Sequence, residues 1–189
     1  MIELSIIEEC KKGKFETTAS KQALSVLIKT STPLAFSLAF RLLGNEVLAA
    51  DVAQETTISI WKNIHKIKSA ESYKTWLYRI VVNKCNDEFR KQKRKQEIHF
   101  DENNWAKISN KLIENPSGEL ENKESANLIS LLTASLSPKQ KSIFILSELE
   151  DLSHEEISKI TSESKANVKA NLYYARKKIS ELLEKYQMI

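Results

Sequence analysis

Apolar side chains recur at helical spacing along most of the first 95 residues. The first clear stretch runs from Leu34 to Leu43 and ends at Gly44-Asn45, which is typical of a helix C-cap. Thr32-Pro33 either starts this helix or kinks a longer one that begins near Lys21. The pattern therefore favours packed helices over strands in this part of the chain.

Two more helices are expected before residue 96. One runs from about Glu46 to His65, and its inner side is expected to hold Val47, Leu48, Val52, Ile58 and Trp61. After a polar loop, Lys66 to Ser72, another runs from about Tyr73 to Lys95 and stacks Leu77, Val81, Cys85 and Phe89 four apart. The opposite face of this helix is polar and holds Arg79, Asn83, Asn86, Asp87, Arg90 and Arg94.

The helical pattern dissolves over residues 96–126 and returns from about Asn127. Ser137-Pro138-Lys139-Gln140 and Ser153-His154-Glu155-Glu156 both read as capping boxes that start helices. A short helix at 154–161, a tight turn at 162–164 and a longer helix form a helix-turn-helix pattern. The core stripe of the longer helix is Val168, Leu172, Ala175, Ile179, Leu182 and Tyr186. We therefore expect an all-α fold of two small helical domains, residues 1–95 and 127–189, joined by a flexible linker over 96–126.

Composition supports this interpretation. The chain of 189 residues has only three Gly and three Pro, too few for a fold built on many tight turns. Its apolar runs are too short for a transmembrane span, so no membrane insertion is expected, and the N-terminus lacks the pattern of a secretory signal. Cys10 and Cys85 form neither a CxxC pair nor a disulfide framework, which suggests reduced thiols in a cytoplasmic protein.

Charge is distributed unevenly along the chain. Residues 62–95 carry eleven Lys or Arg against three acids, a net charge of +8, and residues 165–185 carry +4. The stretch between them, 96–126, carries −4. Two basic segments on either side of an acidic connector are expected of a polyanion-binding protein, although ordinary charged helix faces would give the same count.

No catalytic motif stands out. His65, His99 and His154 are scattered, and the chain has no HExxH, paired Cys ligands, P-loop or nucleophile elbow. We therefore expect no enzymatic activity, no cofactor and no metal site.

Two blocks of sequence together carry a family resemblance. The first comprises residues 35–45, Asp51-Val-Ala-Gln-Glu55, Trp61 and Thr75-Trp-Leu-Tyr-Arg-Ile-Val-Val-Asn83. The second comprises Leu136-Ser-Pro-Lys-Gln140, residues 152–157, Asn167-Val-Lys169 and residues 175–179. In this order and spacing they resemble an extracytoplasmic-function (ECF) sigma factor of bacterial RNA polymerase. The resemblance implies a promoter-melting region 2 in residues 1–95 and a second DNA-reading domain, region 4, in residues 127–189.

The resemblance also implies site residues. Asp51, Gln54 and Glu55 share one helix face, and the family docks this helix, with Trp61, on a coiled coil of core polymerase. The loop at 66–72 and the basic helix after it would recognise and melt the −10 element. The candidates there are Lys66, Lys68, Ser69, Tyr73, Lys74, Arg79, Asn83, Asp87, Arg90 and Arg94. Asn83 suits a base edge, Tyr73 is the preferred aromatic base contact over a core-facing Trp76, and the arginines suit phosphates.

The last helix would read the −35 element. The candidates are Ser164, Lys165, Asn167, Lys169, Ala170, Tyr173, Tyr174, Arg176 and Lys177. Partners implied are core polymerase, promoter DNA and, because such sigma factors are commonly held by one, an anti-sigma protein. The chain departs from the family pattern at Ser162-Glu163, where Gly-Ile is usual in the turn, and at Thr57, where an aromatic residue is usual. A third departure is on the last helix, where Ala170, Asn171 and Tyr174 stand at positions that commonly hold polar Ser or Arg.

Two other functions fit parts of the sequence. A helix-turn-helix regulator that binds duplex DNA without polymerase would explain the C-terminal block but has no need of residues 35–95. A helical protein-interaction adaptor would leave both basic segments unexplained.

Overall fold

The structure, a computed structural model, describes residues 4–12, 17–67, 69, 72–96, 128–130 and 132–185. The expected linker lies almost wholly outside these residues, as does Lys68, so the linker and the domain boundaries stay predictions.

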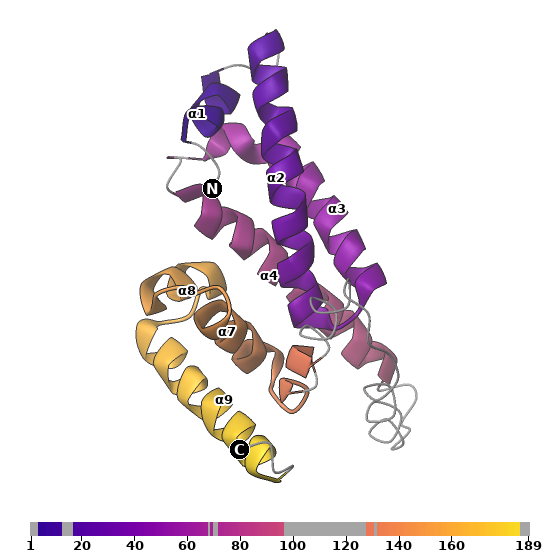
Figure 1. The fold of residues 1–189 in the computed structure, drawn as a ribbon, viewed down its shortest axis with the longest axis vertical. Coiled ribbons are helices and arrows are strands. Elements are labelled where there is room, and N and C mark those ends of the chain that lie inside the picture. Colours follow the sequence, from indigo (N-terminus) through magenta and orange to yellow (C-terminus); the bar gives the residue numbers. More distant parts are fainter. Residues whose placement is uncertain are drawn as a thin grey trace.

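Every regular element in the described part of the chain is helical (Figure 1). The N-terminal unit consists of α1 (Leu4–Lys12), α2 (Thr18–Leu43), α3 (Glu46–Asn63), the short 3₁₀ helix η1 (Ile64–Lys66) and α4 (Ser72–Gln96). The C-terminal unit, residues 128–185 as described, contains α7 (Pro138–Glu148), α8 (His154–Thr161) and α9 (Lys165–Lys185).

Local capping fixes most helix ends where the sequence predicted them. Gly44 ends α2 in the left-handed conformation, φ 63°, and Asn45 then accepts the Leu48 N–H to begin α3. Ser137 and Ser153 form the two expected capping boxes of α7 and α8. The choice at Thr32-Pro33 is settled in favour of one long helix, because α2 begins at Thr18 and continues through Pro33.

α2 is the central helix of the N-terminal unit and contacts α1, α3 and α4. Among the described helices it alone has the length and hydropathy of a membrane span. The core helix of a water-soluble bundle meets the same test, and Leu27, Ala35, Leu38 and Leu42 of α2 are buried in the protein core.

The structure corrects the predicted inner side of α3. Of the five apolar residues expected there, Val52 is buried and Leu48 half-buried. The other three, Val47, Ile58 and Trp61, are exposed by 71%, 44% and 55%. The buried side of α3 instead includes the small residues Ala49, Ala53 and Thr56, and small side chains on a buried side allow neighbouring helices such as α2 to approach closely.

Thr57 of α3 lies on the side that turns toward α2. Its hydroxyl lies 3.0 Å from the hydroxyl of Thr32 on α2, and it also donates to the carbonyl of Ala53. A polar contact between the two helices therefore occupies the position where an aromatic residue is usual in the family.

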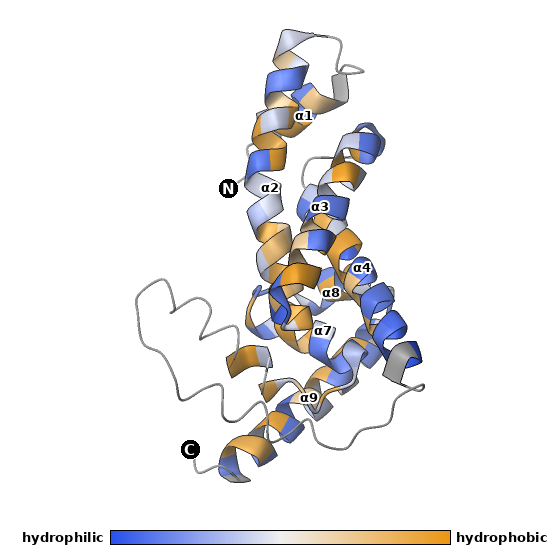
Figure 2. Cartoon of the chain, turned by 90° about the vertical axis from the view of Figure 1, so that its right-hand side faces the viewer, coloured by the Kyte–Doolittle hydropathy of each residue, from blue (hydrophilic) through white to orange (hydrophobic). Residues whose placement is uncertain are grey.

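The two units pack against each other. α7 and α8 lie between α4 and α9, with α8 against α4 (Figure 1). One apolar cluster includes Val81 and Cys85 of α4 as well as Ile157 and Ile160 of α8. Coloured by hydropathy, most helices carry both apolar and polar residues, while the C-terminal half of α4 is mostly hydrophilic (Figure 2). Cys10 and Cys85 are both buried free thiols.

Candidate polymerase and nucleic-acid interfaces

An exposed stripe runs the length of α3, opposite its buried side. It consists of Val47, Asp51, Gln54, Ile58 and Trp61, at successive spacings of 4, 3, 4 and 3 residues. This is the spacing of a coiled-coil seam, in which one helix face meets another helix along its length. Asp51, Gln54 and Trp61 were predicted from the sequence as partner-binding residues. Val47 and Ile58 were missed, because they had been assigned to the core.

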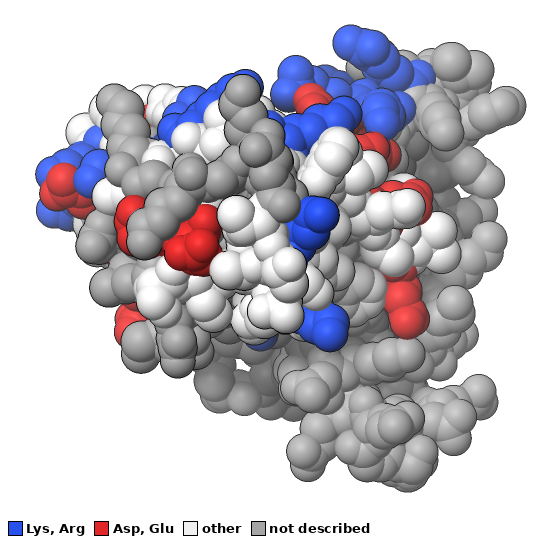
Figure 3. Space-filling view, turned by 90° about the horizontal axis from the view of Figure 1, so that it is seen from above, with Lys and Arg blue, Asp and Glu red and all other residues white. Residues whose placement is uncertain are grey.

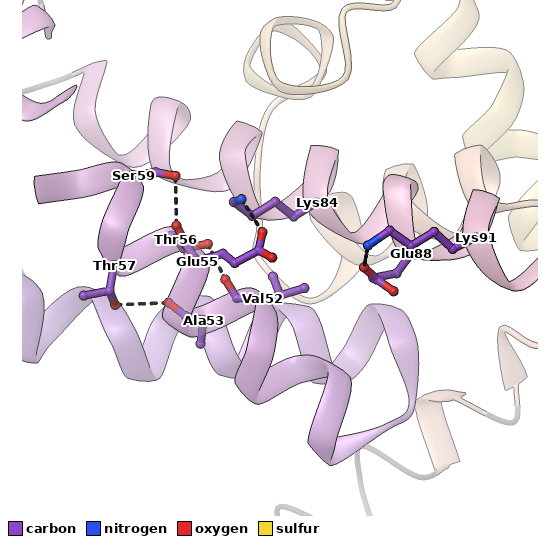
Figure 4. Close-up of polar contacts among 9 residues, drawn as sticks. All are labelled: Val52, Ala53, Glu55, Thr56, Thr57, Ser59, Lys84, Glu88 and Lys91. Carbon is purple, nitrogen blue, oxygen red and sulfur yellow. Dashed lines mark hydrogen bonds and ion pairs between the residues drawn. The ribbon is translucent and has the colours of Figure 1, made fainter. Parts of the chain in front are cut away.

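Glu55 lies beside this stripe and faces α4 instead. Its carboxylate pairs with the Lys84 ammonium of α4 (Figure 4), at a distance of 2.6 Å. Glu88 and Lys91 form a second pair on α4 at 2.6 Å. Between α3 and α4 lies a shallow groove of about 260 Å³ that these charged side chains line. The predicted trio is therefore split: Asp51 and Gln54 stay on the stripe, and Glu55 is engaged within the unit.

α4 carries a polar ridge, which we call the α4 outer face: Arg79, Asn83, Asp87, Arg90 and Arg94. All five are exposed, and Arg90 pairs with Asp87 at 2.8 Å. An exposed pair of this kind contributes little to stability, so Arg90 is free to exchange its partner for a phosphate. The outer face thus offers three cations and one amide on a single side of a helix. In a view from the α2 end, Lys and Arg gather along one side, with some acids among them (Figure 3).

The position of Tyr73 contradicts the prediction that its ring contacts a base. Its ring is 1% exposed, and its hydroxyl lies 2.7 Å from that of the buried Ser31 on α2. Burial raises the pKa of Tyr73 to about 12, against a smaller lowering by the Ser31 hydrogen bond. A side chain held in this way is part of the core and cannot stack on a base. Trp76 is half-buried beside it, with the ring centroids 5.8 Å apart, as the core interpretation expected.

The other candidates near the loop are engaged locally. The Ser69 backbone and side chain exchange hydrogen bonds with Ser72, which fixes the start of α4. Lys66 donates to Asn63 at 3.0 Å, and the Lys74 ammonium lies 5.4 Å from the centre of the Tyr78 ring. Lys66 and Lys74 remain exposed, so both cations are accessible to DNA.

In the C-terminal unit, α8, a short turn and α9 form the expected helix-turn-helix. Ser162 takes the left-handed conformation, φ 58°, that Gly usually supplies in such a turn. Glu163 is held by the Lys139 ammonium at 2.6 Å and by the Asn167 amide at 3.1 Å, and these two hydrogen bonds lower the pKa of Glu163. The substitution of the usual Gly-Ile by Ser162-Glu163 therefore preserves the turn geometry.

The start of α9 has an N-cap, and its first cation is paired with an acid. The Ser164 hydroxyl accepts the Asn167 N–H at 3.1 Å, so Ser164 acts as a cap. The Lys165 ammonium lies 2.9 Å from the Glu155 carboxylate, which lowers the pKa of that carboxyl.

Further along α9, the exposed face presents Lys169, Ala170, Tyr173 and Tyr174. The two tyrosine rings meet edge to face with centroids 5.5 Å apart. Arg176 pairs with Glu148 at 2.7 Å, and Lys177 lies 3.9 Å from Glu181. On the opposite side, Val168, Leu172, Ala175 and Ile179 are buried as predicted. Tyr186 of the predicted stripe lies outside the described residues.

Two families match different parts of the chain. Residues 27–95 match the sigma-70 region 2 family and residues 126–179 match sigma-70 region 4. The RNA polymerase sigma factor SigV of Bacillus subtilis is 31% identical over 142 residues, 75% of this chain and 80% of that protein. The ECF RNA polymerase sigma factor SigW of the same organism is 25% identical over 182 residues, 94% of each chain.

Two solved structures have the same fold. CnrH, in complex with the cytosolic domain of CnrY, aligns with a TM-score of 0.68 over 98% of this chain and 99% of that chain, at 18% identity. The sigma factor RpoE of Bartonella quintana, in complex with the anti-sigma factor NepR, aligns with a TM-score of 0.65 over 85% of this chain and 96% of that chain, at 21% identity. With both regions present in order, this chain belongs to the ECF sigma factors, which bind core RNA polymerase and direct it to promoter DNA.

Proposed function

We propose that the exposed stripe on α3 is the surface by which this sigma factor binds core RNA polymerase. The observation that carries the proposal is the 4-3-4-3 spacing of Val47, Asp51, Gln54, Ile58 and Trp61 on an exposed helix side. Exposure of large apolar side chains to water is unfavourable, and a seam of this spacing buries them against a partner helix. Asp51 would then fix register against a basic partner residue.

The test is a titration of core polymerase with Trp61→Ala and Ile58→Ser variants. Trp61 is the best candidate for an interface hot spot, so its truncation should weaken binding by about 30-fold or more, equivalent to about 2 kcal/mol. Leu128→Ser is the matched control, because Leu128 is exposed to a similar degree, 38%, but lies in the C-terminal unit. Equal affinity of all three variants would refute the assignment of the stripe.

We propose further that the α4 outer face recognises and opens the −10 element while α9 reads the −35 element. Asn83 suits a base edge and Arg79, Arg90 and Arg94 suit phosphates. On α9, Lys169 suits guanine, and Ala170 or Tyr173 a thymine methyl group. Asn83→Ala should impair opening of duplex promoters in permanganate footprinting, and Lys169→Ala should change preference among upstream sequences. Identical defects of both variants on duplex and on pre-melted templates would contradict this division.

We also infer that an anti-sigma protein regulates this chain in the cytoplasm. Support comes from the two similar structures, CnrH and RpoE, each solved with a partner protein, and from the family's place of action beside polymerase. The chain itself is inferred to carry no catalytic activity, because the chemistry of RNA synthesis belongs to the polymerase.

A further inference from the structure

The turn of the helix-turn-helix carries a carboxylate, Glu163, that holds a side chain of α9. One of its oxygens, Oε1, lies 2.6 Å from the Lys139 ammonium of α7. The other oxygen, Oε2, accepts a hydrogen bond from the side-chain amide of Asn167 at 3.1 Å. The backbone carbonyl of Glu163 accepts from the Ser158 hydroxyl of α8 at 2.6 Å. Neighbours on three helices therefore set the position of Glu163 and the directions of both its oxygens.

The contact with Glu163 determines which way the amide of Asn167 points. The hydrogen bonds from Lys139 and Asn167 lower the pKa of Glu163, so this acid stays ionised near neutral pH. An ionised carboxylate only accepts hydrogen bonds, whereas the amide has two donor hydrogens on Nδ2 and an acceptor at Oδ1. If the amide turned over, Oδ1 would face Oε2 and the two acceptors would repel each other. The nitrogen is therefore held against Glu163, and the oxygen points elsewhere.

This orientation leaves a defined pair of groups on Asn167 for a ligand. The backbone N–H of Asn167 donates to the Ser164 hydroxyl at 3.1 Å, and its backbone carbonyl accepts from the Asn171 amide at 2.8 Å. In the described part of the chain, no partner is seen for Oδ1 or for the second hydrogen of Nδ2. Asn167 is exposed in the first turn of α9, and α9 lies on the side of the C-terminal unit away from α4 (Figure 1). One acceptor and one donor are thus presented together on this side of the unit.

An acceptor beside a donor matches adenine among the bases that are read in the major groove. Adenine presents the N6 amino group as a donor and N7 as an acceptor, and an Asn amide can bond to both at once. Guanine presents two acceptors, N7 and O6, and its O6 would face Oδ1. Because one Nδ2 hydrogen is already bonded to Glu163, the amide cannot offer guanine two donors. The held amide therefore discriminates between the two purines.

Lys139 removes the electrostatic disadvantage of an acid at this place. An unpaired carboxylate beside the start of a recognition helix would repel DNA phosphates. The charge of Glu163 is matched by Lys139, and that of the nearby Glu155 by Lys165 at 2.9 Å. Glu163 can therefore orient Asn167 without adding net negative charge to the surface that DNA would approach.

We infer that Glu163 is a positioning residue that orients Asn167 to read adenine at one position of the −35 element. The inference rests on the proposed role of α9 in reading that element, and it adds the base that is read and the residue that selects it. It also gives a function to a departure from the family pattern. The Ile that is usual at the position of Glu163 has no side-chain group to accept a hydrogen bond, so it could not hold the amide.

The test measures base preference at each upstream position. Core polymerase is loaded with the chain and mixed with duplex promoters whose −35 element is randomised, and the bound DNA is sequenced. The variants are Asn167→Ala, Glu163→Ala and Glu163→Gln. Glu163→Gln keeps the size of the side chain, but its amide can also donate to Oδ1 and so permits both orientations of Asn167. Glu155→Ala is the matched control, because it removes an acid beside α9 that pairs with Lys165 and not with Asn167. Thermal melts followed by circular dichroism establish that each variant is folded.

The wild type should prefer adenine over guanine at one upstream position by about tenfold or more, the discrimination that a bidentate contact supplies. Asn167→Ala should abolish this preference, and both Glu163 variants should reduce it to about threefold or less. Preferences at the other positions should be unchanged, which a general defect in folding would not produce. Glu155→Ala frees Lys165 and can change the overall affinity, but the adenine preference should stay as in the wild type.

Three results would overturn the inference. Unchanged base preferences in Asn167→Ala would show that this residue reads no base, and loss of a preference for guanine would show that it reads the wrong one. Full adenine preference in both Glu163 variants would show that Glu163 does not position the amide. The proposed role of α9 is tested separately by Lys169→Ala in the same assay. If neither Lys169→Ala nor Asn167→Ala alters any upstream preference, the proposed role of α9 fails together with the inference.

Discussion

The hydrogen bond between Tyr73 and Ser31 allows a quantitative prediction of how much this contact in the core of the N-terminal unit contributes to the free energy of unfolding. The two hydroxyls are 2.7 Å apart, on α4 and α2, and both residues are buried. Tyr73→Phe removes one hydroxyl and leaves the other without its partner. A buried polar group left in that state costs about 1–3 kcal/mol, so we expect a loss of about 2 kcal/mol in the free energy of unfolding.

A double-mutant cycle isolates this contact. Ser31→Ala should cost a similar amount, whereas Tyr73→Phe/Ser31→Ala should lose less than the sum, because no unpaired hydroxyl remains. The measurements are urea unfolding followed by far-UV circular dichroism and thermal melts. For a chain of this size each kcal/mol shifts the Tm by about 2–4 °C. Strictly additive losses would show that the two hydroxyls are not coupled.

The same variant has a pH signature. The unfolded Tyr73 loses its proton near pH 10 and the folded one near pH 12. The contribution of Tyr73 to the free energy of unfolding is therefore at its full value below pH 10. It declines as the pH rises from 10 to 12, by about 2–3 kcal/mol in total. The difference between wild type and Tyr73→Phe should shrink over that interval. Normal stability of Tyr73→Phe combined with failure to open promoters would refute the reasoning, because it would mean that the ring leaves the core to contact DNA.

Two further predictions concern the C-terminal unit. Lys141 is 7% exposed, and burial lowers its pKa to about 8, so the free energy of unfolding should rise between pH 8 and 10.5 as the unfolded state holds the extra proton. Lys141→Met should remove this rise and stabilise the chain at pH 7 by about 1–3 kcal/mol in urea titrations; an unchanged pH slope would contradict it. Ser162→Gly should raise stability by about 1 kcal/mol, because it relieves the left-handed backbone at φ 58°. A lower melting temperature would instead show that the Ser162 side chain stabilises the turn.

Helix ends were predictable from sequence because their causes are local. A cap such as Ser137 or Ser153 bonds to a backbone group three residues away, so its whole mechanism lies within one short stretch. The buried stripe of α9 was predictable for a similar reason, since that helix has a single apolar side. The helix-turn-helix followed from these two features together.

Contacts between distant residues were not predictable in this way. Tyr73 was expected at the DNA, and nothing near it in sequence indicates that its hydroxyl shares a hydrogen bond with that of Ser31, 42 positions earlier. The Arg41–Glu150 pair spans 109 positions and lies at an interface that the sequence did not predict. A polar side chain in a polar loop has many partners available, and only the packing of helices selects one.

α3 shows why hydrophobicity alone assigned the wrong side to the core. A helix that packs closely on its neighbour needs small side chains at the contact, and Ala49, Ala53 and Thr56 supply them. Val52 and Ile60 are buried with them, but Ile58 and Trp61, which are also large and apolar, lie on the side left to solvent. Exposure of such residues is unfavourable in the free chain, and they contribute favourable free energy only when a partner covers them. A helix with one buried side and a second, exposed apolar side is suited to two interfaces, one within the fold and one with another protein. On α3 the exposed side is the surface that we propose core polymerase covers.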